Sequence, residues 1–276
     1  MFGPELPIIG FDVDPNAMRV RMSDDSRIKL MSDLRKFGQH GTRRPLKEFQ
    51  RIAGYLNWAL NVYPLLRPGL TAVYAKTAGK LQQRAPIWVN RDIKRELAWV
   101  VGHLVVSDGV YFLKSVSWSY RHLPASVLRV YCDASPLGMG FWFPSLRISF
   151  QGEVPGDAPH NTIFFFEALT VVAAIREAAN HLERGGRLAI FSDNLNTVQM
   201  FNSLAALPPM NWLLLFSVDL VLGRDIDFRV FHVSGSKNVV ADHLSRLKTR
   251  DALEAAPGLI IHPFQPPRNA LGASQK

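Results

Sequence analysis

The sequence contains one cysteine, Cys132, and no apolar run long enough to cross a membrane. A single cysteine excludes an internal disulfide, which fits a reducing intracellular location such as the cytoplasm or nucleus. A membrane span needs roughly 18 consecutive apolar residues, so no membrane partner is expected. Charged residues make up only 20% of the chain and hydrophobic residues 47%, which excludes a disordered protein and predicts packed cores.

Positive charge is unevenly distributed along the chain. Of a net charge of +9, residues 1–125 contribute 19 Lys+Arg and 10 Asp+Glu, whereas residues 126–247 contribute 9 and 11. A basic surface attracts a polyanion by releasing its counterions. Residues 1–125 therefore form either a nucleic-acid-binding surface or an ordinary solvated basic face, and the charge alone leaves both interpretations open.

The hydrophobic periodicity changes near residue 126. Before it, apolar residues recur at helical spacing after Ser23, Pro45, Arg67 and Asn90, which predicts a mainly helical region over residues 1–125. From 126 to 247 the pattern predicts an α/β domain with the element order β-β-β-α-β-α-α-β-α. Residues 248–276 are rich in proline and are expected to form a flexible C-terminal tail.

Four acidic residues follow predicted strand ends or helix starts. Asp133 follows the first strand, Glu167 lies early in the long helix, Asp193 follows the fourth strand, and Asp242 lies at the start of the last helix. Because such positions meet at one edge of an α/β sheet, the four carboxylates are expected to converge. Mg²⁺ prefers oxygen ligands, and two ions about 4 Å apart can bind the attacking water and the leaving oxygen of a phosphodiester.

Each of these acids also has a structural explanation when it is taken singly. Asp193 is a natural helix N-cap, Asp242 could interact with a helix dipole, and Glu167 could be a solvated acid in the first turn of its helix. The case for a metal site rests on the four together, in this order of elements.

Four segments of residues 126–247 resemble the acidic motifs of ribonuclease H domains, the last in the form found in retrotransposon polyproteins: VYCDASPLGMGFW, FFEALTVVAAI, FSDNLNTV and HVSGSKNVVADHLSR. The resemblance implies a ribonuclease H-like fold, with a mixed five-stranded sheet and flanking helices. It also implies endonucleolytic cleavage of the RNA strand of RNA–DNA hybrids by a two-metal mechanism. The implied catalytic residues and ligands of two Mg²⁺ or Mn²⁺ ions are Asp133, Glu167, Asp193 and Asp242, with Asn194 and Asn238 contacting the nucleic acid.

The segment before the last predicted helix departs from the bacterial ribonuclease H pattern. Only Ser236 and Lys237 separate Gly235 from Asn238, so the longer loop with its histidine is missing, as in many retrotransposon enzymes. His232 is nearby, but it alternates with apolar residues along a predicted strand. A structural role is therefore expected for His232.

The first half resembles the end of a retroelement reverse transcriptase: its last palm strand, thumb and connection. The segments that carry this resemblance are LPIIGFDVDPNAMRVRMSDDSRIKLMSDLRKF and LKEFQRIAGYLNWALNVYPLLRPGL. It implies that residues 1–125 grip the nucleic acid through basic residues on or beside the predicted helices, namely Arg43, Arg44, Arg67, Lys76, Lys80 and Arg84. The polymerase's Tyr-X-Asp-Asp strand, fingers and most of the palm are absent. No DNA synthesis is expected, and the missing palm and fingers become possible partners.

Two other functions remain open from the sequence. The chain could be a non-catalytic nucleic-acid-binding or assembly module derived from a retroelement, with its nuclease site a relic. A retroviral-type integrase would share the fold but uses three acids, the last a glutamate on a later helix. The last acid here is Asp242, preceded by GSKNVVA, which disfavours an integrase.

Overall fold

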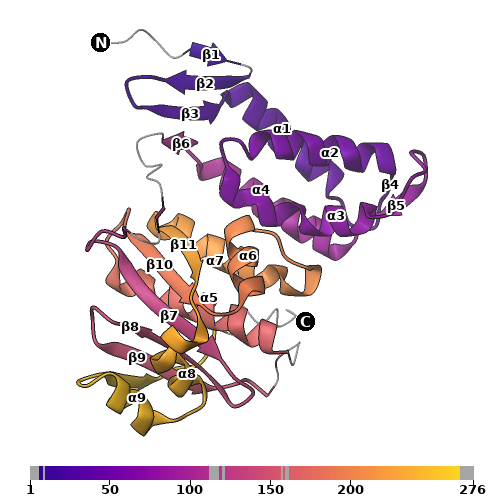
Figure 1. Cartoon of the computed structure of the whole chain (residues 1–276). Helices are drawn as coiled ribbons and strands as arrows, with labels where there is room; N and C mark the ends of the chain where they lie inside the picture. The colour runs from indigo at the N-terminus through magenta and orange to yellow at the C-terminus, as the bar shows by residue number, and fades with distance from the viewer. Residues whose placement is uncertain are drawn as a thin grey trace. The chain divides into compact units, whose positions relative to one another are not determined.

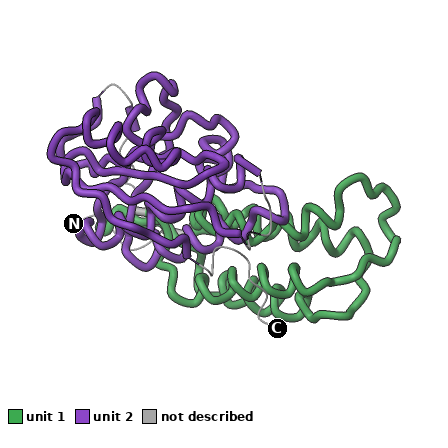
Figure 2. Tube along the Cα trace, turned by 90° about the horizontal axis from the view of Figure 1, so that it is seen from below, with its two compact units in different colours: residues 1–117 green, residues 118–276 purple. Residues whose placement is uncertain are grey.

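The computed structural model describes residues 6–8, 10–111, 118–119, 122–156, 158 and 162–267. The chain divides into two compact units, Met1–Ser117 (unit 1) and Trp118–Lys276 (unit 2), which have different colours in Figure 2. Unit 1 contains 18 Lys+Arg and 10 Asp+Glu, whereas unit 2 contains 14 and 13. The basic excess of the chain therefore belongs to unit 1.

Unit 1 combines helices with a small antiparallel sheet. Its strands, in the sheet order β1-β2-β3-β6, are β1 (Leu6–Ile8), β2 (Phe11–Asp14), β3 (Arg19–Met22) and β6 (Val110–Tyr111). Its α-helices are α1 (Asp24–Phe37), α2 (Leu46–Ala59), α3 (Thr71–Thr77) and α4 (Arg91–Val106), with the 3₁₀ helix η1 (Pro64–Leu70) before α3. The mainly helical region expected from the periodicity is confirmed, with the small sheet as an addition.

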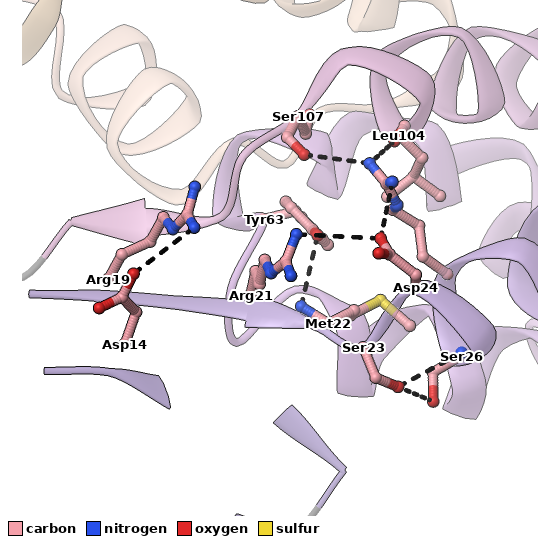
Figure 3. A network of polar contacts seen from close by, with 11 residues as sticks. Asp14, Arg19, Arg21, Met22, Ser23, Asp24, Ser26, Tyr63, Leu104 and Ser107 are labelled. Atoms are coloured by element: carbon pink, nitrogen blue, oxygen red, sulfur yellow. Dashed lines mark hydrogen bonds and ion pairs between the residues drawn. The ribbon is translucent and has the colours of Figure 1, made fainter. Parts of the chain in front are cut away.

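Polar contacts fix the start of α1 against β3 (Figure 3). The Ser23 hydroxyl accepts a hydrogen bond from the Ser26 amide at 3.4 Å, which caps the helix. The Met22 amide donates to the Tyr63 hydroxyl at 3.4 Å, and Arg21 lies 3.9 Å from the Asp24 carboxylate. These contacts join the sheet of unit 1 to its helices.

A two-stranded ribbon lies between the helices of unit 1 in sequence. It consists of β4 (Arg43–Pro45) and β5 (Pro86–Trp88), paired antiparallel so that Arg43 is opposite Trp88. After it, the Asn90 side chain accepts a hydrogen bond from the Ile93 amide at 3.0 Å and starts α4, as the sequence predicts.

Unit 2 is built on a mixed six-stranded sheet with the order β11-β10-β7-β8-β9-β12 (Figure 1). The strands are β7 (Leu128–Ala134), β8 (Gly138–Phe143), β9 (Ile148–Glu153), β10 (Arg187–Ser192), β11 (Asp227–His232) and β12 (Ile260–Pro263). Strands β7, β8 and β9 are antiparallel, whereas β10 is parallel to both β7 and β11. The predicted α/β fold and its order of elements are confirmed.

Two helices contact opposite faces of this sheet. They are α5 (Ile163–His181) and α8 (Val239–Ser245). The ring of Phe143 in β8 lies 5.8 Å from the ring of His181 in α5, whereas a methyl group at Gly140 would lie 2.4 Å from Leu244 Cβ of α8. Residues 140 and 143 point to opposite faces of a strand. The missing side chain at Gly140 therefore allows α8 to lie directly on the sheet.

The remaining helices of this part of unit 2 are α6 (Leu195–Ser203) and α7 (Asn211–Arg224), separated by the 3₁₀ helix η3 (Pro208–Met210). Helix α7 packs against α5 and buries Leu213, Leu214 and Val218 completely. Among the described helices, none alone has the length and apolar composition of a membrane span. Only α6 and the η3–α7 segment reach these values as a pair, with a bend of 80° between them.

The C-terminal segment differs from the sequence prediction. Residues expected to form a flexible tail contain α9 (Thr249–Ala255) and β12, which pairs parallel with β9. Ala252 and Leu259 are buried together with Val240 and Leu244 of α8. The prolines of this segment led to the prediction of a flexible tail, although the segment also contains a short apolar stretch. Strand β12 makes the sheet six-stranded rather than five-stranded. Residues 268–276 of the predicted tail lie outside the described residues.

Candidate active site

Three of the four predicted acids converge in unit 2. One carboxylate oxygen from each of Asp133, Glu167 and Asp193 lies within 4.8 Å of the other two. Asp133 is the next-to-last residue of β7 and Asp193 follows β10, and these parallel strands pair Tyr131 with Phe191, two residues before each acid. Glu167 reaches the same place from α5. We call these three residues the acidic triad.

Two serine hydroxyls orient the triad. The Ser245 hydroxyl of α8 lies 2.5 Å from Asp133 Oδ2, and the Ser192 hydroxyl lies 3.5 Å from Glu167 Oε2. Each hydroxyl donates to its carboxylate and so limits the rotation of that side chain. The sequence analysis missed both serines. Their signal is proximity, because Ser192 directly precedes Asp193 and Ser245 ends the helix that contains Asp242.

Two members of the triad, Glu167 and Asp133, are buried, and burial raises the pKa of both carboxyl groups. Glu167 is 3% exposed and Asp133 6% exposed. The pKa of Glu167 is raised to about 9, mainly by burial and also by the charges of Asp133 and Asp193, whereas the hydrogen bonds from the Ala134 amide and Ser192 lower it. Burial likewise raises the pKa of Asp133 to about 7, with contributions from Asp193 and Asp242, whereas the Ser245 hydrogen bond lowers it.

The raised pKa values of Glu167 and Asp133 indicate that little positive charge of the protein lies near these carboxylates. Three carboxylates at such distances repel one another, so protons partly neutralise them. A divalent cation would do the same, and the all-oxygen donor set suits Mg²⁺ or Mn²⁺ rather than metals that prefer sulfur or nitrogen. The residues present therefore fit a hard divalent cation.

The fourth acid, Asp242, lies beside the triad and not within it. Its Oδ1 is 2.7 Å from Nε of Arg246, one helical turn further along α8. The negative charge of Asp242 nevertheless raises the pKa of Asp133, so the two carboxylates are electrostatic neighbours. The structure thus brings three predicted ligands together and holds the fourth in an ion pair.

The structural explanations considered for Asp193 and Glu167 are wrong. The N-cap of α6 is Asn194, whose side-chain oxygen accepts a hydrogen bond from the Thr197 amide at 3.1 Å. Asp193 therefore has no capping role, and its carboxylate joins the triad instead. Glu167 is buried and is not a solvated acid of the first helical turn. Contact of Asn194 with nucleic acid stays a prediction.

The prediction that Asn238 contacts nucleic acid needs correction. This residue is 1% exposed, and its side-chain amide donates to the Cys132 carbonyl at 2.9 Å. Because Cys132 precedes Asp133, Asn238 ties the start of α8 to the strand that carries the first acid. Its contribution is to position these elements, and its side chain does not reach the surface.

The short turn before α8 lies close to Asp193. It forms the 3₁₀ helix η4 (Gly235–Lys237), and a methyl group at Gly235 would lie 3.2 Å from Asp193 Oδ2. His232 at the end of β11 is exposed, so the expected position on an apolar face is wrong. The reason is that β11 is the outermost strand of the sheet, where the alternation of the sequence does not ensure burial.

The six basic residues predicted to bind nucleic acid all belong to unit 1. Arg43 and Arg44 lie on β4, Arg67 lies in η1, Lys76 lies near the end of α3, and Lys80 and Arg84 lie between α3 and β5. The guanidinium of Arg44 already forms an ion pair with Glu48 at 3.5 Å and donates a hydrogen bond to the Lys36 carbonyl at 3.0 Å. The others are exposed, apart from the half-buried Lys76. Their contact with nucleic acid stays a prediction.

Comparison with known proteins gives structural similarity alone. No protein-family profile and no curated protein matches the sequence. Ribonuclease H1 from the halophilic archaeon Halobacterium salinarum is 18% identical over 47% of this chain and 99% of its own, with a TM-score of 0.33. The N-terminal ribonuclease H domain of a Mycobacterium tuberculosis protein is 14% identical over 47% and 99%, with a TM-score of 0.32.

A foamy viral protease–reverse transcriptase, solved in complex with double-stranded DNA, is 17% identical over 82% of this chain, with a TM-score of 0.28. This chain spans 38% of the length of that protein. Unit 2 itself has an α/β fold with the order of strands and helices that the sequence predicts.

Proposed function

We propose that unit 2 is a metal-dependent endonuclease that cuts the RNA strand of RNA–DNA hybrids. The observation that carries this proposal is the acidic triad, in which oxygens of Asp133, Glu167 and Asp193 lie within 4.8 Å of one another. Its position at the ends of two parallel strands is the usual place for a site in an α/β sheet. The resemblance of the four acidic segments to ribonuclease H motifs specifies the substrate.

In this proposal the triad and Asp242 hold two Mg²⁺ or Mn²⁺ ions. Two such ions, when bound, supply activation of the attacking water and stabilisation of the leaving oxygen. The protein's own contribution is to orient and to exchange protons. Ser245 and Ser192 orient Asp133 and Glu167. The raised pKa values of these two acids mean that they release protons when the ions enter.

We further propose that the chain derives from a retroelement reverse transcriptase and that unit 1 supplies most of the affinity for the substrate. The basic excess of unit 1 supports this division, since unit 2 has nearly balanced charge. Without a Tyr-X-Asp-Asp segment the chain lacks the polymerase's metal-binding strand. The pure protein is therefore expected to add no nucleotides in a primer-extension assay.

The test is incubation of the purified full chain with a hybrid labelled on its RNA strand, beside a DNA duplex of the same sequence. We expect cleavage of RNA in the hybrid alone, only when Mg²⁺ or Mn²⁺ is present, and none with a chelator. Tight binding without cleavage under all metal conditions would support the non-catalytic module instead. Metal-dependent processing of the DNA duplex ends would support an integrase.

A further inference from the structure

Among the six tryptophans, all of which lie in the described part of the chain, only Trp88 is exposed, with 51% of its surface accessible. It lies on β5, where burial alternates. Ile87 and Val89 are buried at 5% and 1%, whereas Pro86 and Trp88 face outward. The residues on either side of Trp88 in the sequence contribute to the hydrophobic core, and the indole ring of Trp88 remains accessible at the surface.

The side chain of Arg43 already covers part of the indole ring of Trp88. Arg43 lies opposite Trp88 in the ribbon, and its guanidinium carbon is 4.2 Å from the centre of the Trp88 ring. Among the described residues, no carboxylate forms an ion pair with Arg43. A planar guanidinium stacked on an indole leaves its N–H edges free for acceptors such as phosphate oxygens. The pair thus combines a flat apolar surface with an unneutralised positive charge.

The sequence around the ribbon is almost free of negative charge. Residues 39–91 contain nine Lys+Arg and one acid, Glu48, which lies 3.5 Å from Arg44. Arg84 and Arg91 are exposed on either side of β5 along the chain. The exposed cations on or next to the ribbon in the chain, Arg43, Arg84 and Arg91, therefore favour the binding of a polyanion at the strands that also carry the Trp88 ring.

We propose that Trp88 and Arg43 form a stacking site for an unpaired nucleobase of a single-stranded nucleic acid. Electropositive surfaces with exposed aromatic rings bind single strands because every base has a face that can stack. Within a duplex those faces are covered by neighbouring base pairs, so the indole would select unpaired bases. This site does not depend on the acidic triad and would stand if unit 2 proved inactive.

The test measures binding of the full chain, with a chelator present, to a fluorescent oligothymidylate and to an abasic strand of equal length and charge. The wild-type protein should prefer the strand with bases by on the order of 10- to 100-fold. Trp88→Leu should abolish this preference, and Trp88→Phe should retain most of it because a ring remains. Arg43→Ala should weaken the preference and also lower the dependence of log affinity on log salt by about one unit.

Leu81→Ser is the matched control, because Leu81 is an apolar side chain with 88% exposure in the same basic segment and has no ring. It should keep the preference for bases. Equal binding of both strands by the wild-type protein would overturn the proposal, as would an undiminished preference in Trp88→Leu. Loss of the preference in Leu81→Ser would assign it to apolar contact in general and would also overturn the stacking site.

Discussion

Arg246 holds Asp242 in an ion pair of 2.7 Å on the solvent side of α8. Both side chains are partly exposed, at 51% and 38%, so the pair itself contributes little to folding. Its consequence is local: it competes with a divalent cation for the carboxylate that we propose as the fourth ligand. This competition can be measured.

Arg246→Gln should therefore strengthen the binding of Mg²⁺ or Mn²⁺ by a few-fold, since an exposed ion pair is worth at most about 1 kcal/mol. The measurement is the metal concentration that gives half of the maximal rise in melting temperature. The control is Arg250→Gln, because Arg250 forms the same kind of pair with Glu254, 2.9 Å away on α9. An unchanged midpoint in Arg246→Gln would show that Asp242 takes no part in binding the metal.

The stability of the metal-free protein should fall as the pH rises. Burial raises the pKa of Glu167 to about 9 and that of Asp133 to about 7, so the folded state keeps protons that the unfolded chain releases above about pH 4.5. Stability then decreases with pH by about 1.4 kcal/mol per unit for each extra proton held in the folded state. The loss continues to about pH 9, with Glu167 alone responsible above about pH 7.

Urea unfolding at several pH values, with a chelator and then with Mg²⁺, measures this effect. The stabilisation by Mg²⁺ should grow with pH, because fewer protons then have to leave. Asp193→Asn should flatten the metal-free pH dependence, since Asp193 contributes to both raised pKa values. Stability that rises between pH 5 and pH 9 without metal would contradict the raised pKa values.

Asp193→Asn should reduce cleavage of an RNA–DNA hybrid by more than about 100-fold, since weaker perturbations around metal sites cost 10- to 100-fold. The substitution removes a charge and almost no volume, so the circular dichroism spectrum should not change. Asp219→Asn is the control, because Asp219 is an exposed aspartate of α7. Equal rates for wild type and Asp193→Asn would remove Asp193 from the proposed site.

Gly140→Ala should destabilise unit 2 by about 1–3 kcal/mol, the usual cost of overpacking. The new methyl group would lie 2.4 Å from Leu244 Cβ and 2.8 Å from the Leu244 carbonyl carbon, so α8 itself would have to move. Because Ser245 and Asp242 lie on α8, hybrid cleavage should fall as well, even below the melting temperature. Gly223→Ala in α7 is the control, since a methyl group there meets nothing within 4 Å.

Deletion of residues 1–117 should raise KM for the hybrid far more than it lowers kcat. Unit 1 carries the basic excess, and each lost phosphate contact lowers the dependence of log affinity on log salt by about one unit. Circular dichroism and thermal unfolding establish first that residues 118–276 are folded. If this fragment bound hybrid as tightly as the full chain, with the same salt dependence, the basic residues would be an ordinary solvated face.

The sequence was sufficient to predict the acidic triad. Asp133 and Asp193 lie at the ends of predicted strands that must meet at one edge of a sheet, and Glu167 lies early in the long helix that comes between these strands in the chain. The sequence was not sufficient for the contacts that orient the triad. Ser245 and Asp133 are 112 positions apart, and their contact depends on how closely α8 approaches β8 at Gly140. The Asp242–Arg246 ion pair, by contrast, could have been inferred from the sequence, because residues four positions apart are neighbours on the surface of a helix.

The strand β12 has a consequence for solubility. It covers β9, which would otherwise present a row of unpaired amide and carbonyl groups to other copies of the chain. A fragment that stopped at Leu247, where the ribonuclease H resemblance ends, would expose this template and should aggregate. Pro263, the last residue of β12, has no amide hydrogen to donate, so it discourages a further strand from pairing outside β12 at this position. Residues 260–263, which the sequence analysis assigned to a flexible tail, are thus expected to limit pairing between copies of the chain at β9.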